Sequence, residues 1–176
     1  METMRPSSVV AHRRLGILFG CSLLLACGQS GPPALTVSVP SPAHQYTASL
    51  PTDWTSSLGS GPADPDTFSG PQGKVTAVEA VIPEGQPRDA WADFYADART
   101  SEFGASCFGG GGTPADAVQV GQETGYLRSV PCISGWIVIV THGEHGYDFR
   151  FANASGSQSD AGKALFESIL RGITFQ

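Results

Sequence analysis

Apolar and polar positions alternate along several stretches after residue 44, which is the pattern of half-buried β-strands. The first alternation runs from Tyr46 to Leu50 and stops at Pro51. A β-branched run at 74–82 (KVTAVEAVI) is apolar on both faces except at Glu79, which favours an interior strand. Further strands are expected at 67–69, 117–120, 126–132, 136–141 and 147–151.

The last two of these strands are joined by Gly143-Glu144-His145-Gly146, which predicts a β-hairpin. We expect Thr141 to pair with Asp148 in this hairpin. One face then carries the large apolar side chains, namely Trp136, Val138, Val140, Tyr147, Phe149 and Phe151. The other face carries Ile137, Ile139, Asp148 and Arg150. The first of these faces should form the main core surface.

Two segments change to helical spacing. Within 87–103, one helix face would hold Trp91, Phe94, Tyr95 and Ala98. A second helix, capped by Asp160, would bury Phe166, Ile169, Leu170 and Ile173. This element order predicts an α+β fold over residues 44–176, a mostly antiparallel sheet packed with two helices.

The N-terminal segment has the organisation of a secretion signal. Residues 1–14 are polar and end in Arg13-Arg14, and residues 15–26 (LGILFGCSLLLA) form an apolar run of 12. A bilayer span needs about 20 apolar residues, so this run is too short to cross. Residues 1–26 are therefore predicted to be a signal peptide.

The end of this segment, Leu24-Leu25-Ala26-Cys27, resembles the lipobox of bacterial lipoproteins. A thiol is needed to accept a diacylglyceryl group, and a small preceding residue lets the signal peptidase approach the bond. Several acyl chains such as palmitate on Cys27 would hold the protein at the extracytoplasmic face of the cell membrane. The alternative is an ordinary signal peptide with a chance cysteine. Residues 27–43 (CGQSGPPALTVSVPSPA) are rich in Pro, Gly and Ser, which favours an extended tether.

Cys107 and Cys132 are the two thiols that remain after Cys21 leaves with the signal and Cys27 is acylated. In an oxidising compartment their pairing is the simplest outcome. Such a disulfide would contribute about 3 kcal/mol in the chain-entropy model. A redox or metal pair is the alternative, but the spacing of these cysteines is not C-x-x-C.

Charge is distributed unevenly and limits the partners. The whole chain has 10 basic and 16 acidic side chains, a net charge of −6. The three arginines of residues 1–26 are opposed by Glu2 alone, so the remainder has a net charge of −8. A dispersed acidic surface does not suit a polyanion, which argues against nucleic acid as a partner.

Four segments resemble the PsbP-like superfamily, including the lipid-anchored LpqN-type proteins of bacterial envelopes. They are 46–54 (YTASLPTDW), 89–99 (DAWADFYADAR), the hairpin 136–151, and 164–175 (ALFESILRGITF). The resemblance covers most of 44–176 and implies an α/β/α-sandwich-like domain for docking to proteins or small ligands, generally without enzymatic activity. It transfers no binding residue, because the motifs contain no signature of functional groups.

Candidate chemistry is sparse, and no cofactor is expected. His142, Glu144 and His145 could bind a transition metal weakly, but their spacing matches no zinc motif, and a solvated hairpin tip is favoured. No G-x-S-x-G motif is present, although a Ser-His-Asp site assembled in space, for example with His44, stays an alternative. The sequence therefore favours a non-catalytic, lipid-anchored module that binds an envelope protein. The alternatives are a carrier with an apolar pocket beneath the Trp91 helix and a hydrolase.

Overall fold

The computed structural model describes residues 31–82, 84–88, 90–92, 95 and 115–176. Most of its strands form a seven-stranded sheet of order β3-β4-β5-β9-β8-β7-β6, in which every neighbouring pair is antiparallel. The strands are β3 (Thr55–Ser57), β4 (Asp66–Gly70), β5 (Gly73–Val81), β6 (Asp116–Val120), β7 (Glu123–Val130), β8 (Gly135–His142) and β9 (His145–Asn153).

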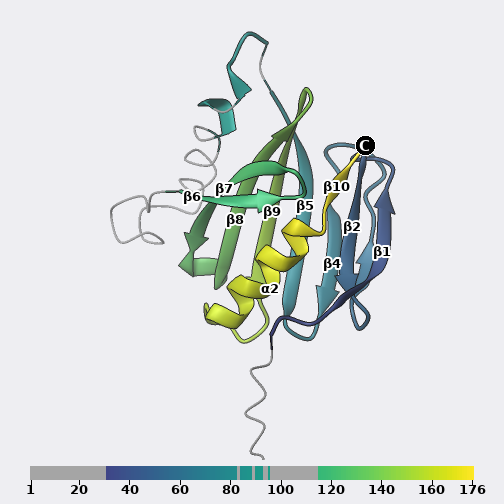
Figure 1. Ribbon diagram of the computed structural model, residues 1–176, viewed down its shortest axis with the longest axis vertical. Helices are drawn as coiled ribbons and strands as arrows, with labels where there is room; N and C mark the ends of the chain where they lie inside the picture. The colour runs from purple at the N-terminus through teal and green to yellow at the C-terminus, as the bar shows by residue number, and fades with distance from the viewer. Residues whose placement is uncertain (1–30, 83, 89, 93–94, 96–114) are drawn as a thin grey trace, which may run out of the picture.

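A smaller sheet and a helix lie against this large sheet (Figure 1). The smaller sheet has the order β1-β2-β10, with strands β1 (Leu35–Ser41), β2 (Tyr46–Pro51) and β10 (Thr174–Phe175). Helix α2 (Asp160–Arg171) follows β9, and a short 3-10 helix, η2 (Pro131–Ile133), joins β7 to β8. In the described part of the chain no helix is long and apolar enough to cross a membrane.

The main core lies between the large sheet and the layer formed by α2 and β2. All six apolar residues expected on the hairpin's core face are buried there, which confirms that face. Phe166 of α2 stacks on Phe151 at 5.5 Å between ring centroids, and Tyr46 of β2 contacts Phe149 at 5.7 Å. Burying an aromatic side chain of this size contributes about 2–3 kcal/mol, so these contacts fix both elements on the sheet.

The opposite face of the large sheet has its own apolar cluster. Ile137, Ile139 and Val130 pack there with Trp91 and Ala92. Residues 88, 90–92 and 95 are helical, as predicted, whereas Phe94 and Ala98 lie outside the described residues. With helices on both faces, the α+β fold with an antiparallel sheet and two helices is confirmed.

The register of the β8–β9 hairpin differs from the predicted one. His142 pairs with His145 and Trp136 with Phe151, so the predicted pairing of Thr141 with Asp148 is wrong by two residues. The turn closes after two residues because Gly143 adopts a φ of +57°, which suits the first position of a tight hairpin turn. Side chains alternate with a period of two, so this shift leaves both predicted faces unchanged.

Part of the predicted tether at 27–43 is folded instead. Residues Leu35–Ser41 form β1, which pairs with β2, so the domain begins well before residue 44. Leu35, Val37 and Val39 are half-buried while the residues between them are exposed. Pro40 is tolerated because β1 is an edge strand. The alternation of Leu35, Val37 and Val39 is the signal for this strand, and the Pro- and Ser-rich composition around it obscures that signal.

Three element boundaries also differ from expectation. Cys132 lies in η2 rather than in a strand, because Pro131 ends the ladder after Val130. Ser159, not Asp160, caps α2, and its hydroxyl accepts a hydrogen bond from the Gly162 amide at 3.1 Å. Ile173 is buried as expected but lies beyond the end of the helix.

Candidate functional site

Four ionisable side chains form a row across one end of the large sheet. We call Glu123, His142, His145 and Glu79 the acid–histidine row. Glu123 is on β7, His142 on β8, His145 on β9 and Glu79 on β5, four strands that are neighbours in that order. The distance from Nδ1 of His142 to Oε1 of Glu123 is 2.7 Å, and that from Nδ1 of His145 to Oε1 of Glu79 is also 2.7 Å.

The row lies over the end of the main core. His142 stacks on Phe175 with ring centroids 4.8 Å apart, and Phe175 in turn lies 4.9 Å from Tyr147. Burial, and then the negative charge of Glu79, raise the pKa of Tyr147 to about 12. The two histidine side chains are 35% and 38% exposed. The row can therefore meet a partner while its aromatic support fixes its position.

We call this end of the large sheet the upper end (Figure 1). Two pockets open there. One of about 130 Å³ is lined by Glu123, His142 and Phe175 together with residues of the adjoining turns. The other, of about 330 Å³, is lined by Glu84, Arg88 and Glu144 among others. Both pockets are lined by charged side chains that solvent reaches, so a polar or charged ligand suits them better than an apolar one.

The metal ligands considered from the sequence are only partly brought together. His142 and His145 are cross-strand partners, but Glu144 lies in the exposed turn and belongs to neither histidine–glutamate pair. Each histidine already holds a carboxylate through Nδ1. Among the residues that the structure describes, no group of three or more His, Cys, Asp or Glu side chains is placed to hold a metal ion.

A second histidine–carboxylate site is buried. The carboxylate of Asp66 accepts hydrogen bonds from the Tyr46 hydroxyl at 2.7 Å and from the Gly59 amide at 2.8 Å. His44 Nε2 lies 3.8 Å from Asp66 Oδ1 and 3.0 Å from the Asp64 carbonyl oxygen. Burial, and then the bond to Asp66, raise the pKa of Tyr46 far above its ordinary value.

This buried site has a structural role. All three side chains of this site are 0% exposed, so the imidazole is out of contact with solutes in the folded domain: His44, Tyr46 and Asp66. The contacts connect the β1–β2 turn to the start of β4, which ties the small sheet to the large one. The Ser60 amide and hydroxyl both donate to Asp64, which lowers the pKa of that exposed carboxyl and orders the preceding loop.

The cysteine predictions fall mainly outside the described residues. Cys27 and Cys107 are not among the described residues, and Cys132 is exposed in η2. Lipidation of Cys27 and the bond between Cys107 and Cys132 therefore stay predictions. The carrier alternative places an apolar pocket beneath the Trp91 helix. In the described part of that region, Trp91 is 2% exposed and packs closely against Ile137 and Ile139.

Sequence reasoning proposed neither glutamate of the row as a site residue, although Glu79 carries a signal. It is the single charged residue within 75–82, a mostly apolar strand segment. Glu123 carries no such mark, because it follows a polar turn in a segment of mixed character. The paired carboxylates Asp64 and Asp66 lie in a Pro-rich loop, a pattern that favours solvated charges. This interpretation is wrong for Asp66, which is 0% exposed.

Comparison with known proteins bears on the fold. No protein-family model matches the chain, and no curated protein matches it in sequence. The solution structure of cyanobacterial PsbP (CyanoP) from Synechocystis sp. PCC 6803 is similar, with a TM-score of 0.56 and 14% identity over 87% of this chain and 99% of that chain. This chain has a PsbP-like fold.

A second solved structure, from Bacteroides thetaiotaomicron VPI-5482, has a TM-score of 0.48 and 12% identity, over 81% of this chain and 49% of that chain. At 14% identity the likeness to CyanoP concerns the fold alone. It confirms the PsbP-like architecture expected from the sequence, whereas the relation to LpqN-type lipoproteins stays a prediction.

Proposed function

We propose that this PsbP-like domain is a membrane-anchored, non-catalytic lipoprotein of the LpqN type, which docks an envelope protein at the extracytoplasmic face. The observation that carries the proposal is the sequence Leu24-Leu25-Ala26-Cys27 directly after an apolar run of 12. The first strand of the domain begins at Leu35, so little chain separates the expected lipid from the folded body. An anchored domain with so short a connection acts close to the membrane.

Docking of a protein is supported by the character of the upper end. The acid–histidine row presents two carboxylate–imidazole pairs across four neighbouring strands. Glu123 and both histidines are 35–38% exposed, and Glu79 is 16% exposed. Among the described residues, Leu58 is the large hydrophobic side chain that is exposed, at 42%. The partner is therefore recognised through polar and charged groups, and a basic surface complements Glu79, Glu84 and Glu123.

The anchor is tested by following where the full chain goes in a bacterial host. Cys27→Ala should leave the protein unprocessed or released from the membrane fraction, because the acceptor thiol is gone. Cys21→Ala is the matched control, since it removes the cysteine that lies within the signal and should leave processing and membrane retention unchanged. Normal processing and retention of Cys27→Ala would refute the anchor.

Docking is tested by cross-linking in intact envelopes. The wild-type chain should give a discrete cross-linked partner, and Glu79→Gln with Glu123→Gln should reduce its yield about tenfold by removing both negative charges. Asp160→Asn removes one exposed charge at the opposite end of the sheet and serves as the control. Equal yields from all three proteins would show that the acid–histidine row does not contact the partner.

A further inference from the structure

The described chain starts at the end of the molecule opposite the acid–histidine row (Figure 1). Gly31, Pro32 and Pro33 line a pocket of about 330 Å³ together with Gln72 of the β4–β5 turn and Leu165 of α2. We call this end the base; it also includes the loop between β9 and α2. The polypeptide therefore enters the domain at its base.

Covalent geometry limits how far the base can lie from Cys27. Gly31 follows Cys27 by four positions, and an extended chain spans at most about 3.5 Å per position, or about 14 Å in all. Strand β5 runs from Gly73 at the base to Val81 at the upper end, a length of about 30 Å for nine residues. The connection is thus about half as long as the sheet is tall.

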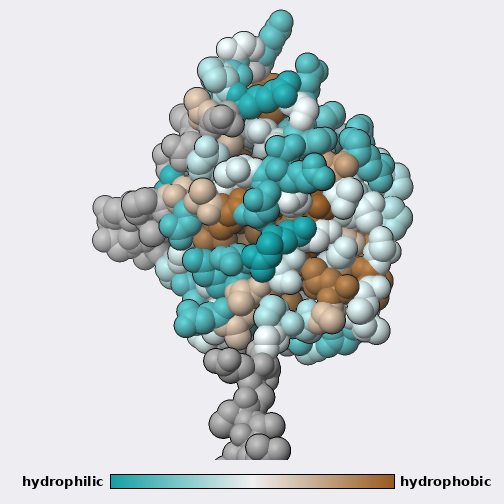
Figure 2. Space-filling model, in the orientation of Figure 1, coloured by the Kyte–Doolittle hydropathy of each residue, from teal (hydrophilic) through white to brown (hydrophobic). Residues whose placement is uncertain are grey.

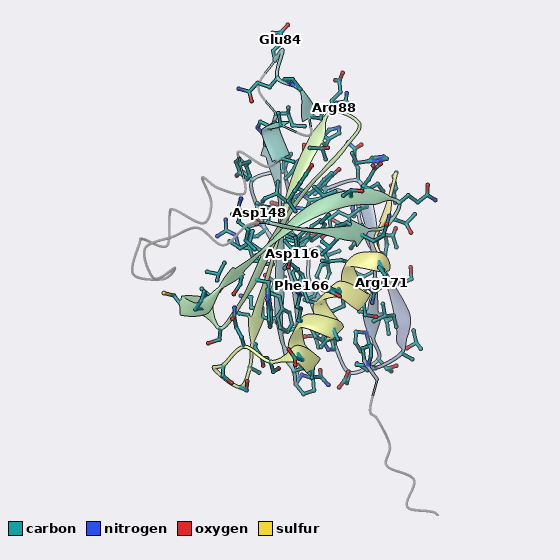
Figure 3. All side chains as sticks on the ribbon, turned by 60° about the vertical axis from the view of Figure 1, so that its left-hand side comes forward. Glu84, Arg88, Asp116, Asp148, Phe166 and Arg171 are labelled. Carbon is teal, nitrogen blue, oxygen red and sulfur yellow. The ribbon has the colours of Figure 1, made fainter. Side chains whose placement is uncertain are left out.

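The two ends also differ in charge. No residue that lines the pocket at the base carries a charge. The upper end carries Glu79, Glu84, Glu123 and Glu144 together with Arg88, and Figure 3 shows Glu84 at its extremity. Next to the base pocket, the first turn of α2 carries Asp160. A bilayer that contains anionic lipid therefore repels the upper end more strongly than the base.

We propose that the anchored domain stands on its base, with the pocket and the β9–α2 loop against the lipid headgroups and the acid–histidine row directed away from the membrane. The ligand of the base is the polar surface of the bilayer itself. This orientation rests on the proposed anchor at Cys27. It places the row about 30 Å above the base, where a partner standing off the membrane meets it.

The orientation is tested with the full lipidated chain, purified from membranes and reconstituted in phosphatidylcholine vesicles that contain some anionic lipid. A small fluorescent amino acid is placed at Ser157 in the base or at Glu144 in the upper turn, both of which are exposed. The lipid headgroups carry a short-range quencher. The probe at 157 should be quenched several-fold more than the probe at 144, and a probe at Glu84 should behave like that at 144.

The same samples separate the orientation from the anchor. Flotation with the vesicles reports attachment, and Cys27→Ala should not float. Flotation with equal quenching at 157 and 144 would overturn the orientation and leave the anchor intact. Loss of flotation for the wild-type chain would overturn the anchor and the orientation together. Stronger quenching at 144 would show that the domain lies with its acidic end toward the lipid.

Discussion

The base and the upper end of the large sheet are built from the same strands but differ in charge and polarity. At the base, neutral side chains such as Gln72, Asn153 and Ser159 surround the entry of the chain. At the upper end, carboxylates pair with histidines above an aromatic core. Figure 2 shows a mostly hydrophilic outer face between the two ends, with apolar residues appearing mainly in its middle and lower right. The domain is thus polarised from end to end.

Buried ionisable groups in this domain stabilise the fold, whereas half-exposed ones are available to bind a partner. His44 and Asp66 are sealed and tie two sheets together, whereas His142 and His145 keep about a third of their side-chain surface in solvent. The buried carboxylate of Asp66 depends on the hydrogen bonds that it accepts within the protein, while a half-exposed group can exchange water for a partner. The exposed pairs are therefore the better candidates for recognition.

The largest effect on this comparison is expected from Asp66→Ala. The substitution leaves the Tyr46 hydroxyl and the Gly59 amide without their acceptor, and it should cost about 3–5 kcal/mol of unfolding free energy. Asp160→Ala, an exposed carboxylate in the first turn of α2, should cost less than about 1 kcal/mol. Urea unfolding midpoints compare the two variants, and similar costs would contradict the structural role of the sealed site.

Alkaline pH should weaken the upper end next. The folded-state pKa of Tyr147, about 12, lies above its ordinary value of 10.0, so folding favours the neutral phenol. That stabilisation is complete below pH 10 and is lost as pH rises towards 12. Its ceiling is about 3 kcal/mol for a shift of this size. Tyr147→Phe should flatten the loss of urea stability in this window, and an unchanged pH profile would contradict the assignment.

A smaller effect is expected at the base from Ser159→Ala. The substitution removes the side-chain cap that accepts from Gly162 and should cost about 1 kcal/mol. Ser157→Ala, in the same exposed loop but outside the cap, is the matched control and should stay within about 0.5 kcal/mol. Thermal unfolding distinguishes them, and equal shifts would mean that the cap does not stabilise α2.

The smallest effect is expected from Glu123→Gln in the acid–histidine row. A half-exposed pair with His142 should be worth less than about 1 kcal/mol and should weaken with salt. A double-mutant cycle with His142→Gln isolates the pair from the stacking of His142 on Phe175. A coupling energy that is large and independent of salt would mean that the pair is structural, like the sealed site.

The sequence was sufficient for six of the seven strands of the main sheet because their signals were local and strong. The edge strand β3 was not predicted, because its three residues are polar and exposed. Alternation in 136–141 and 147–151 assigned every core residue to its face, although the turn at Gly143 closed two residues tighter than expected. Strand β1 was missed because Pro40 and the serines around it look like a linker until β2 is available to pair with them. Strand β10 was missed because it is two residues long, too short to show an alternating pattern.

The candidate site was less accessible to sequence reasoning because it depends on contacts between distant strands. His145 and Glu79 are 66 positions apart, and His142 and Glu123 are 19 apart. The sequence placed both histidines at a hairpin end, but their carboxylate partners follow from the order in which β5 and β7 flank that hairpin. Glu144, the neighbour in sequence, lies in the exposed turn instead.

The most direct test of the account is the mass of the N-terminal peptide of the mature protein purified from its own membranes. We predict a peptide that begins at Cys27 and carries the added mass of a diacylglyceryl group, with residues 1–26 removed. A mature protein that retains residues 1–26, or that begins elsewhere with an unmodified Cys27, would contradict the anchor on which the proposed function and the orientation both depend.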